Sequence, residues 1–412
     1  MEKYRAFSGP RAFQYLSEDD RYLSARPDAL FNFGFVGCGN MGQEHMFNTL
    51  LEGRATVSAI YDQAPRSVEN ALSNLARRYP NEQPPKTYDS LDALCADDEI
   101  DALIISTPNF THIDVVRALV GCNKALFLEK PIATTLADAA EIYRLLSEHP
   151  HYVQIGLQYR YKSVYREALL ETMARKSLGK VYSVNLLEHR FPFLDKVEQW
   201  NKFSEKTGGT LVEKCCHYFD LINVFAQGTP TRVFATGKQS VNFTEFSREN
   251  VPADGLDHAQ VLIEFDNDVS GNFSLNMFTS GSREELVLCG DQARLHTIET
   301  SRLGEANQNE MHLWSQDLNA SRTIQPNYPE HISQAGHHGS TFFEHVALVD
   351  GLLGEQTLDV LPATLDDALW SVVVAFAAQE SIATGQPVEI ADIRPEGLPD
   401  RTKDNLLNET TH

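Results

Sequence analysis

The chain has 412 residues and a formal net charge of −22, with 42% hydrophobic and 22% charged residues. This composition is ordinary for a globular protein of two or three domains, and the negative field disfavours nucleic acids and anionic membranes as partners. No apolar run approaches the roughly 20 residues that cross a bilayer. Because no export signal opens the chain either, we expect a cytoplasmic protein without a membrane segment.

The cysteines agree with that expectation. Six cysteines lie at scattered positions without the C-x-x-C spacing of a zinc site, which predicts reduced thiols. Cys215 and Cys216 are adjacent, and a disulfide between neighbours is strained, so we expect them to be small packing residues.

The two ends of the chain differ from its middle. Residues 1–30 are polar and aromatic, and we expect an arm, helical around residues 10–24, that contacts another subunit or covers a cofactor. Residues 396–412 are expected to form a frayed tail.

The first strand-like run, Phe31–Val36, ends in a glycine-rich turn, and residues 43–51 then read as a helix. The turn has the pattern G-x-G-x-x-G and comprises Gly37, Cys38, Gly39, Asn40, Met41 and Gly42. In a dinucleotide-binding turn the first glycine permits the bend, the second lets a pyrophosphate approach, and the third lets helix and strand pack closely. The pattern therefore predicts a nucleotide-phosphate site at this turn.

A second anchor lies at the end of the next strand-like run. Asp62 follows Thr56–Tyr61, at the spacing where a carboxylate holds the adenosine ribose hydroxyls. A 2′-phosphate would meet a like charge there, which predicts NAD rather than NADP, although Arg66 is placed to pair with such a phosphate. The alternative interpretation is a turn that binds no ligand and an aspartate that caps the next helix.

Strands and helices alternate from residue 31 to about residue 155. The nearly continuous apolar run Ala102–Ser106 is typical of a strand covered on both faces. The alternation of strands and helices predicts a doubly wound parallel sheet over residues 31–155, which is the architecture of a Rossmann dinucleotide-binding domain.

Two polar turns follow strands of this domain. Thr107, Pro108 and Asn109 come after Ala102–Ser106, with His112 opening the next helix. Because ligands of open α/β sheets bind at the carboxyl ends of the strands, we expect this turn to line the cofactor. A capped helix start is the alternative.

Glu129, Lys130 and Pro131 follow the strand Ala125–Leu128 at the same edge, where we expect Glu129 and Lys130 to contact the cofactor. Pro131 fixes the turn, and a cis bond before it is compatible with the sequence. A lysine at the mouth of a nucleotide crevice is a candidate for catalysis because partial burial lowers its pKa. A solvated loop charge is the alternative.

Beyond the Rossmann pattern, Gly208 and Gly209 precede a helix predicted over Leu211–Ala226. Glu213 and His217 are four residues apart and share a face of that helix, and a carboxylate can orient an imidazole that acts as a general base. An ordinary surface pair and two ligands of a metal are the alternatives. No third ligand is spaced to match, so no metal is expected.

Most of the remaining chain is strand-like. In Ala259–Phe265 the apolar residues Val261, Ile263 and Phe265 alternate with polar ones. This predicts a second α/β domain over residues 156–395, with a large open, mostly antiparallel sheet covered by helices on one face and able to contact a partner subunit with the other.

The order of these motifs resembles the Gfo/Idh/MocA family of nicotinamide-dependent sugar and cyclitol oxidoreductases. The resemblance covers about residues 31–392 and includes Gln158-Tyr159-Arg160-Tyr161 and Leu178-Gly179-Lys180-Val181. It implies a Rossmann domain joined to an α/β domain, NAD as cofactor, a carbohydrate substrate, and a homodimer or homotetramer.

The resemblance also assigns roles. Lys130 corresponds to the catalytic lysine and His217 to the acid/base histidine, while Glu213 stands where the family usually has aspartate. Lys214-Cys215-Cys216 replaces a segment that usually contains glycine. The resemblance thus implies that Lys130 and His217 are catalytic. The departures from the family pattern bear on the identity of the substrate and on the path of the proton.

Other residues are weaker candidates for substrate contacts. Tyr159 and Arg160 follow a strand and could bind hydroxyls or an anionic group. Trp200 could stack on a sugar face or pack under its loop, and His338 lies on a loop before a helix.

We expect NAD across Gly37–Gly42, with its nicotinamide near Lys130 and His217. His217 would take the substrate hydroxyl proton as hydride leaves the carbon, and Lys130 would stabilise the developing alkoxide. Three hypotheses about the function remain: a dehydrogenase, an NAD-dependent glycoside hydrolase that oxidises and re-reduces its substrate, and a non-enzymatic nucleotide sensor. Base rates favour the dehydrogenase, and the presence of both Lys130 and His217 argues against the sensor.

Overall fold

The computed structural model describes residues 29–193, 195–302 and 307–401. The helix expected around residues 10–24 and most of the expected C-terminal tail lie outside the described residues. The chain divides into two compact units. Unit 1 comprises residues 1–129, 144–162 and 328–363, and unit 2 comprises residues 130–143, 163–327 and 364–412.

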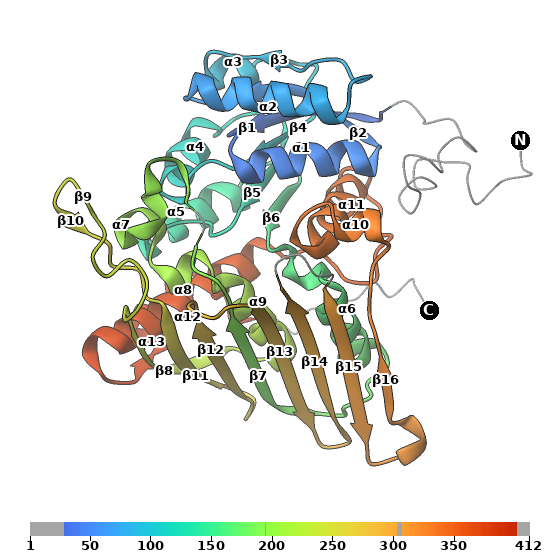
Figure 1. Cartoon of the computed structure of the whole chain (residues 1–412), viewed down its shortest axis with the longest axis vertical. Coiled ribbons are helices and arrows are strands. Elements are labelled where there is room, and N and C mark those ends of the chain that lie inside the picture. Colours follow the sequence, from blue (N-terminus) through green and yellow to red (C-terminus); the bar gives the residue numbers. More distant parts are fainter. Residues whose placement is uncertain (1–28, 194, 303–306, 402–412) are drawn as a thin grey trace, which may run out of the picture. The chain divides into compact units, whose positions relative to one another are not determined.

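Unit 1 is built on a parallel six-stranded sheet in the order β3-β2-β1-β4-β5-β6 (Figure 1). Its strands are β1 (Phe31–Val36), β2 (Ala55–Tyr61), β3 (Lys86–Thr87), β4 (Ala102–Ile105), β5 (Ala125–Glu129) and β6 (Val153–Gly156). The strand order reverses between β1 and β4, as in a doubly wound sheet, and all four residues of β4 are buried. The predicted Rossmann sheet is therefore confirmed.

Six α-helices belong wholly to unit 1 among the described residues, and a seventh belongs to it in part. They are α1 (Asn40–Glu52), α2 (Pro65–Arg78), α3 (Leu91–Cys95), α4 (His112–Ala118), α10 (Glu330–Ser333) and α11 (Ser340–Leu353), while α5 (Leu136–Ser147) crosses the boundary of the two units. Helix α11 packs on α1, and its Leu348 and Val349 join the core formed by Phe33, Phe35 and Met46. This packing is why residues 328–363 belong to unit 1 although they come late in the chain. The functional domain boundaries at residues 155 and 395 stay a prediction.

Unit 2 contains a nine-stranded sheet in the order β16-β15-β14-β13-β7-β12-β11-β8-β17 (Figure 1). These strands are β7 (Val181–His189), β8 (Pro230–Lys238), β11 (His258–Phe265), β12 (Ser270–Asn276), β13 (Ser282–Gly290), β14 (Ala293–Ser301), β15 (Gln308–Ser315), β16 (Arg322–Ile324) and β17 (Val388–Glu389). Every neighbouring pair is antiparallel except β12 with β7. This agrees with the predicted mostly antiparallel sheet.

Helices cover one face of this sheet. Helix α12 (Leu365–Thr384) contacts β8, α9 (Cys216–Ala226) contacts β7 and β12, and α6 (Ser163–Leu169) contacts β14 and β15. Buried and exposed residues alternate along β11, as its apolar pattern predicts. Phe234 and Leu262, paired across β8 and β11, lie on the opposite face and are exposed.

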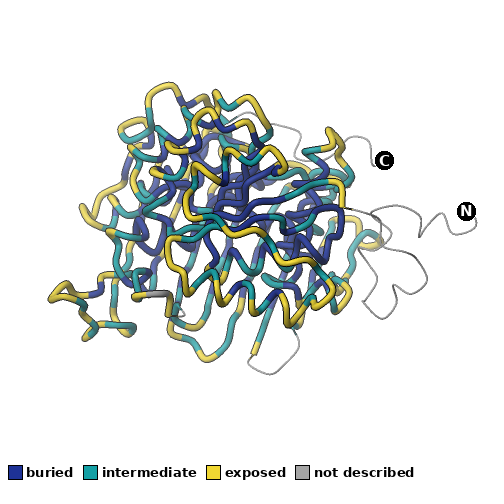
Figure 2. The backbone as a smooth tube through the Cα atoms, turned by 90° about the horizontal axis from the view of Figure 1, so that it is seen from above, coloured by how far each residue is buried: buried dark blue, intermediate teal, exposed yellow. Residues whose placement is uncertain are grey.

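Short elements complete unit 2. They are the helices α7 (Ser204–Thr207), α8 (Thr210–Glu213) and α13 (Ile390–Ile393), and a hairpin of β9 (Ser247–Arg248) and β10 (Val251–Pro252). Burial is concentrated in the strands and in the helices that cover them, whereas many connecting turns are exposed (Figure 2). Within the described parts of the chain, no helix combines the length and the apolar character needed to cross a membrane.

Candidate active site

The turn after β1 requires glycine at two positions. Gly37 has a φ of 99°, and a Cβ there would lie 2.8 Å from the carbonyl carbon of Ser106. A Cβ on Gly42 would lie 2.0 Å from the carbonyl oxygen of Gly37. The first and third glycines of the motif therefore let β1, β4 and α1 approach one another.

The second glycine of the motif borders open space. A Cβ on Gly39 would have no heavy atom within 4 Å. Gly39 is also the N-cap of α1, which has no side-chain cap bond and no acidic residue in its first turn, where Asn40 and Met41 lie. Uncapped amides and the positive end of the helix dipole suit a phosphate, so this turn fits the pyrophosphate of a dinucleotide.

Asp62 joins the end of β2 to this turn. Its Oδ2 accepts a hydrogen bond of 2.7 Å from the Cys38 amide, and its Oδ1 accepts one of 2.8 Å from the Ala64 amide. Each carboxylate oxygen has a further lone pair, so Asp62 can still accept from a ribose hydroxyl. Burial, together with the nearby charge of Asp62, raises the pKa of the Cys38 thiol to about 12, which keeps it neutral.

The turn after β4 has one unsatisfied polar group. Thr107 accepts a hydrogen bond of 2.8 Å from the Thr111 hydroxyl, and its carbonyl oxygen lies 3.1 Å from His112 Nε2. Asn109, next to Pro108, is buried, and its Nδ2 has no hydrogen-bond partner among the described residues. A buried amide without an acceptor suits a ligand that carries one, and this agrees with a cofactor-lining turn.

The end of β5 contributes to both units. In unit 1, the Glu129 carboxylate lies 2.8 Å from Nε2 of His45 on α1. In unit 2, Lys130 precedes Pro131 through the cis bond that the sequence allowed, and Lys130 Nζ donates a hydrogen bond of 3.0 Å to the Glu213 carbonyl oxygen. The lysine is thus bound to the segment that leads to His217.

That segment begins at two glycines with positive φ. A Cβ on Gly209 would lie 1.8 Å from Oε1 of Gln379, whose Nε2 donates to the Gly208 carbonyl oxygen over 2.9 Å. The predicted single helix from Leu211 to Ala226 is wrong in one respect, because a turn at residues 214–215 separates α8 from α9. The break coincides with Lys214, whose largely buried amine lies 3.3 Å from the Glu188 carboxylate.

The interruption changes the environment of Glu213. Its Oε1 accepts a hydrogen bond of 2.9 Å from Lys196, and its buried Oε2 has no hydrogen-bond partner among the described residues. The Glu213 carboxylate is therefore paired with Lys196, and its second oxygen is left to accept from another group. The amine of Lys196 also lies 4.3 Å from the centroid of the Trp200 ring, so it joins two of the predicted substrate residues.

His217 lies in the first turn of α9, which is buried along its whole length. The two cysteines before it are free thiols, as predicted, and burial raises the pKa of both, to about 12 for Cys216. They are therefore neutral packing residues, and the reactive candidates in this segment are Lys130, Glu213 and His217.

The remaining candidates lie in unit 1. Tyr159 and Arg160 are buried in the 3-10 turn Gln158–Tyr161. His338 is partly buried in the turn before α11, and its neighbour His337 approaches the Tyr159 ring with a centroid distance of 6.4 Å. His337 also bonds Glu44 over 2.7 Å.

Four residues around these groups have no predicted site role: Lys196, Lys214, His45 and Glu344. Lys196 bonds Glu213 and His45 bonds Glu129, while Lys214 directly follows Glu213 and pairs with Glu188. A ligand atom of Glu344 lies within 4.8 Å of one of Glu129. Lys196 belongs to none of the motifs, and His45 lies within a helix where periodicity gives no signal. The signal that could have drawn attention to Lys214 is its place in the segment that departs from the family pattern.

Two family models match this chain. Residues 31–157 match the model described as "Oxidoreductase family, NAD-binding Rossmann fold", and residues 171–390 match "Oxidoreductase family, C-terminal alpha/beta domain", both of the Gfo/Idh/MocA type. Together the two matches cover most of the chain.

Individual relatives are distant. The rhizopine catabolism protein MocA of Rhizobium meliloti is 24% identical over 60% of this chain and 71% of its own length. Inositol 2-dehydrogenase of Acidiphilium cryptum is 30% identical over 39% of this chain and 45% of its own length. A structure of levoglucosan dehydrogenase with NADH and L-sorbose superposes with a TM-score of 0.71 at 17% identity, covering 89% of this chain and 100% of that chain, which supports the fold.

Proposed function

The chain belongs to the Gfo/Idh/MocA family of NAD-binding oxidoreductases, and we propose that it transfers hydride between NAD and a hydroxyl-bearing carbon of a sugar, sugar derivative or cyclitol. Family membership confirms the resemblance inferred from the motifs and the nicotinamide cofactor. The substrate class rests on relatives named for inositol and sugars.

The observation that carries the proposal is the hydrogen bond of 3.0 Å from Lys130 Nζ to the Glu213 carbonyl oxygen. It ties the lysine of the family pattern to the segment that leads to His217, within one unit. A lysine and a histidine together are the minimum set for alcohol oxidation, because one stabilises negative charge on oxygen and the other accepts its proton.

The cofactor would be held by unit 1. The uncapped start of α1 at Gly39 would bind the pyrophosphate, Asp62 the adenosine ribose, and the amide of Asn109 an acceptor group of the cofactor. When bound, NAD supplies the hydride acceptor.

The protein side chains would supply the proton chemistry. His217 would remove the hydroxyl proton of the substrate as the carbon–hydrogen bond breaks, and the Lys130 ammonium would stabilise the negative charge that develops on that oxygen. Glu213, held by Lys196, would accept a hydrogen bond from a second hydroxyl through its unpartnered Oε2. Trp200 would stack on the sugar face next to the same lysine, and Tyr159, Arg160 and His338 are further candidates for substrate contacts.

A screen with the intact protein tests the proposal. A panel of sugars, sugar acids and cyclitols is incubated with NAD, and NADH formation is followed by absorbance. We expect at least one member to be oxidised by the wild type and not by His217→Ala. Turnover of every active compound at equal rates by both proteins would contradict the assignment of His217.

We further propose that the chain forms a homodimer or homotetramer through the open face of the nine-stranded sheet. Phe234, Leu262 and Trp314 are exposed, with 37%, 54% and 43% of their surfaces accessible. Phe234 and Leu262 are cross-strand partners on this face. Burial of such apolar side chains favours association. Light scattering of the wild type and of Leu262→Lys should show an oligomer that the variant weakens, and a monomeric wild type would contradict the proposal.

A further inference from the structure

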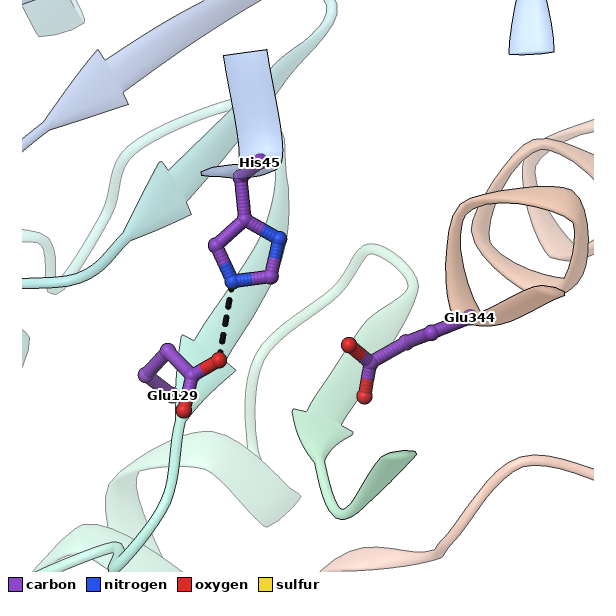
Figure 3. A group of neighbouring side chains, drawn as sticks. All are labelled: His45, Glu129 and Glu344. Atoms are coloured by element: carbon purple, nitrogen blue, oxygen red, sulfur yellow. Dashed lines mark hydrogen bonds and ion pairs between the residues drawn. The ribbon is translucent and has the colours of Figure 1, made fainter. Parts of the chain in front are cut away.

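Three ionisable side chains that are far apart in sequence meet inside unit 1 (Figure 3). His45 comes from α1, Glu129 from the end of β5 and Glu344 from α11. One potential ligand atom of each lies within 4.8 Å of the others, and all three residues are at least nine-tenths buried. The group is therefore shielded from solvent and close enough to act together.

The hydrogen bonds behind His45 fix which ring nitrogen carries its proton. The Thr49 hydroxyl donates to the His45 carbonyl oxygen over 2.9 Å, so towards His345 Nδ1, 3.3 Å away, it can only accept. His345 thus has its proton on Nδ1, and in the neutral ring its Nε2 is an acceptor. That Nε2 lies 2.9 Å from Nδ1 of His45, so His45 donates from Nδ1.

A neutral His45 therefore presents the lone pair of Nε2 towards Glu129. The carboxylate oxygen of Glu129 lies 2.8 Å from that nitrogen, and it is also an acceptor. Two acceptors at this distance need a positive charge between them, which is either a proton or a metal ion.

Glu344 favours the metal ion. Its carboxylate points from α11 towards the other two side chains (Figure 3), and its Oε2 is buried without a hydrogen-bond partner among the described residues. A single shared proton between His45 and Glu129 leaves Glu344 unsatisfied. A dication bound by all three would satisfy Glu344 and balance both carboxylates, which matters because isolated charges are costly inside a protein.

We propose that His45 Nε2, Glu129 and Glu344 bind one zinc ion. One imidazole and two carboxylates are ligands that Zn²⁺ accepts in tetrahedral sites, with a fourth position left for water. The bond from His45 Nδ1 to His345 takes the place of the carboxylate, carbonyl or water that usually accepts this proton in metal-binding histidines, and it selects the tautomer that binds through Nε2. All three proposed ligands belong to unit 1, whereas Glu213 and His217, for which the sequence supplied no third ligand, belong to unit 2.

The test measures zinc in the full-length protein. Wild type, Glu344→Gln and Glu44→Gln are produced with zinc in the medium, dialysed against a chelator, and analysed for metal by mass spectrometry. Gln is close in shape to Glu but is a poor zinc ligand. Glu44 is a matched control because it is a neighbouring carboxylate on α1 that bonds His337 and Thr341 instead of belonging to the group.

We expect about one zinc per chain in the wild type and in Glu44→Gln, and at least a roughly tenfold lower content in Glu344→Gln, given that even loss of supporting contacts costs about 10–100-fold in affinity. A wild type without zinc, or equal zinc in wild type and Glu344→Gln, would overturn the proposal.

X-ray absorption on the wild type identifies the atoms that bind zinc, and it does not depend on how Glu344→Gln folds. The proposed ligands require only nitrogen and oxygen neighbours at about 2.0–2.2 Å, whereas a site built from the cysteines would add sulfur at about 2.3 Å. A sulfur shell would assign the zinc to cysteines and overturn the proposal.

Discussion

Helices α1 and α8 both begin after glycines, but the candidate sites at their N-termini are formed in different ways. Before α1, Gly37 and Gly42 are required by the backbone, and the binding groups are backbone amides. Before α8, Gly208 and Gly209 both have positive φ, which favours glycine, but the chemistry belongs to side chains that follow. The first site is formed by local backbone geometry, whereas the second depends on which side chains reach it from elsewhere in unit 2.

Glu213 illustrates the difference. Its spacing from His217 is that of neighbours on one helix, yet a turn at residues 214–215 intervenes and Lys196 binds its carboxylate instead. A glycine that leaves no space for a Cβ is required by the local backbone, so the sequence reveals it. The partner of a carboxylate can come from anywhere in the chain, so the sequence does not reveal it. Substitutions in the two regions should therefore have different effects. Those near α8 should lower the rate of catalysis, and those near α1 should lower stability or NAD binding.

The largest effect is expected from the catalytic side chains of unit 2. Lys130→Ala and His217→Ala should each lower kcat by at least about 10²-fold, the usual contribution of a general acid or base. Both variants should melt near the wild type and bind NAD by calorimetry. A near-normal kcat in either variant would remove that residue from the mechanism.

A smaller effect is expected from the backbone of the phosphate turn. Gly42→Ala should destabilise the fold by about 2 kcal/mol, because a Cβ would lie 2.0 Å from the Gly37 carbonyl oxygen. Gly39→Ala meets open space, so it should keep the melting temperature and weaken NAD binding only. Denaturant unfolding and calorimetry of both variants check this, and equal stability of the two would contradict the packing argument.

A still smaller effect is expected at the ribose site, which should bind NAD more tightly than NADP. We expect at least roughly tenfold tighter binding of NAD than NADP, about 1.4 kcal/mol, because Asp62 repels a 2′-phosphate. Calorimetry with both nucleotides measures the ratio. Similar affinities would mean that Arg66 compensates the charge.

The smallest effect is expected from Lys196→Met. Loss of the amine removes the ion pair that holds Glu213, so the substrate should bind less tightly and KM should rise while kcat stays near the wild-type value. The loss in kcat/KM should be about threefold, since Lys196 is 39% exposed and its charge is partly screened. Steady-state kinetics measure this, and an unchanged KM would show that Lys196 does not position Glu213 for the substrate.

These regions also show what the sequence could predict. The alternation of strands and helices, the glycine turn and the position of Asp62 depend on neighbours in the chain, so the Rossmann sheet and its strand ends were predictable. The packing of residues 328–363 with α1, the pairing of Lys196 with Glu213, and the meeting of His45, Glu129 and Glu344 depend on tertiary contacts over long sequence separations. Periodicity and spacing give no information on such contacts.

The cofactor stoichiometry of the reaction tests the central claim most directly. With the substrate found by screening, the account predicts one NADH formed, or consumed, per molecule of product. Sustained cleavage of a glycoside with less than one NAD per turnover, no net change in the NADH band, and solvent deuterium incorporated beside the oxidised carbon would contradict the dehydrogenase assignment and establish the redox-neutral hydrolase in its place.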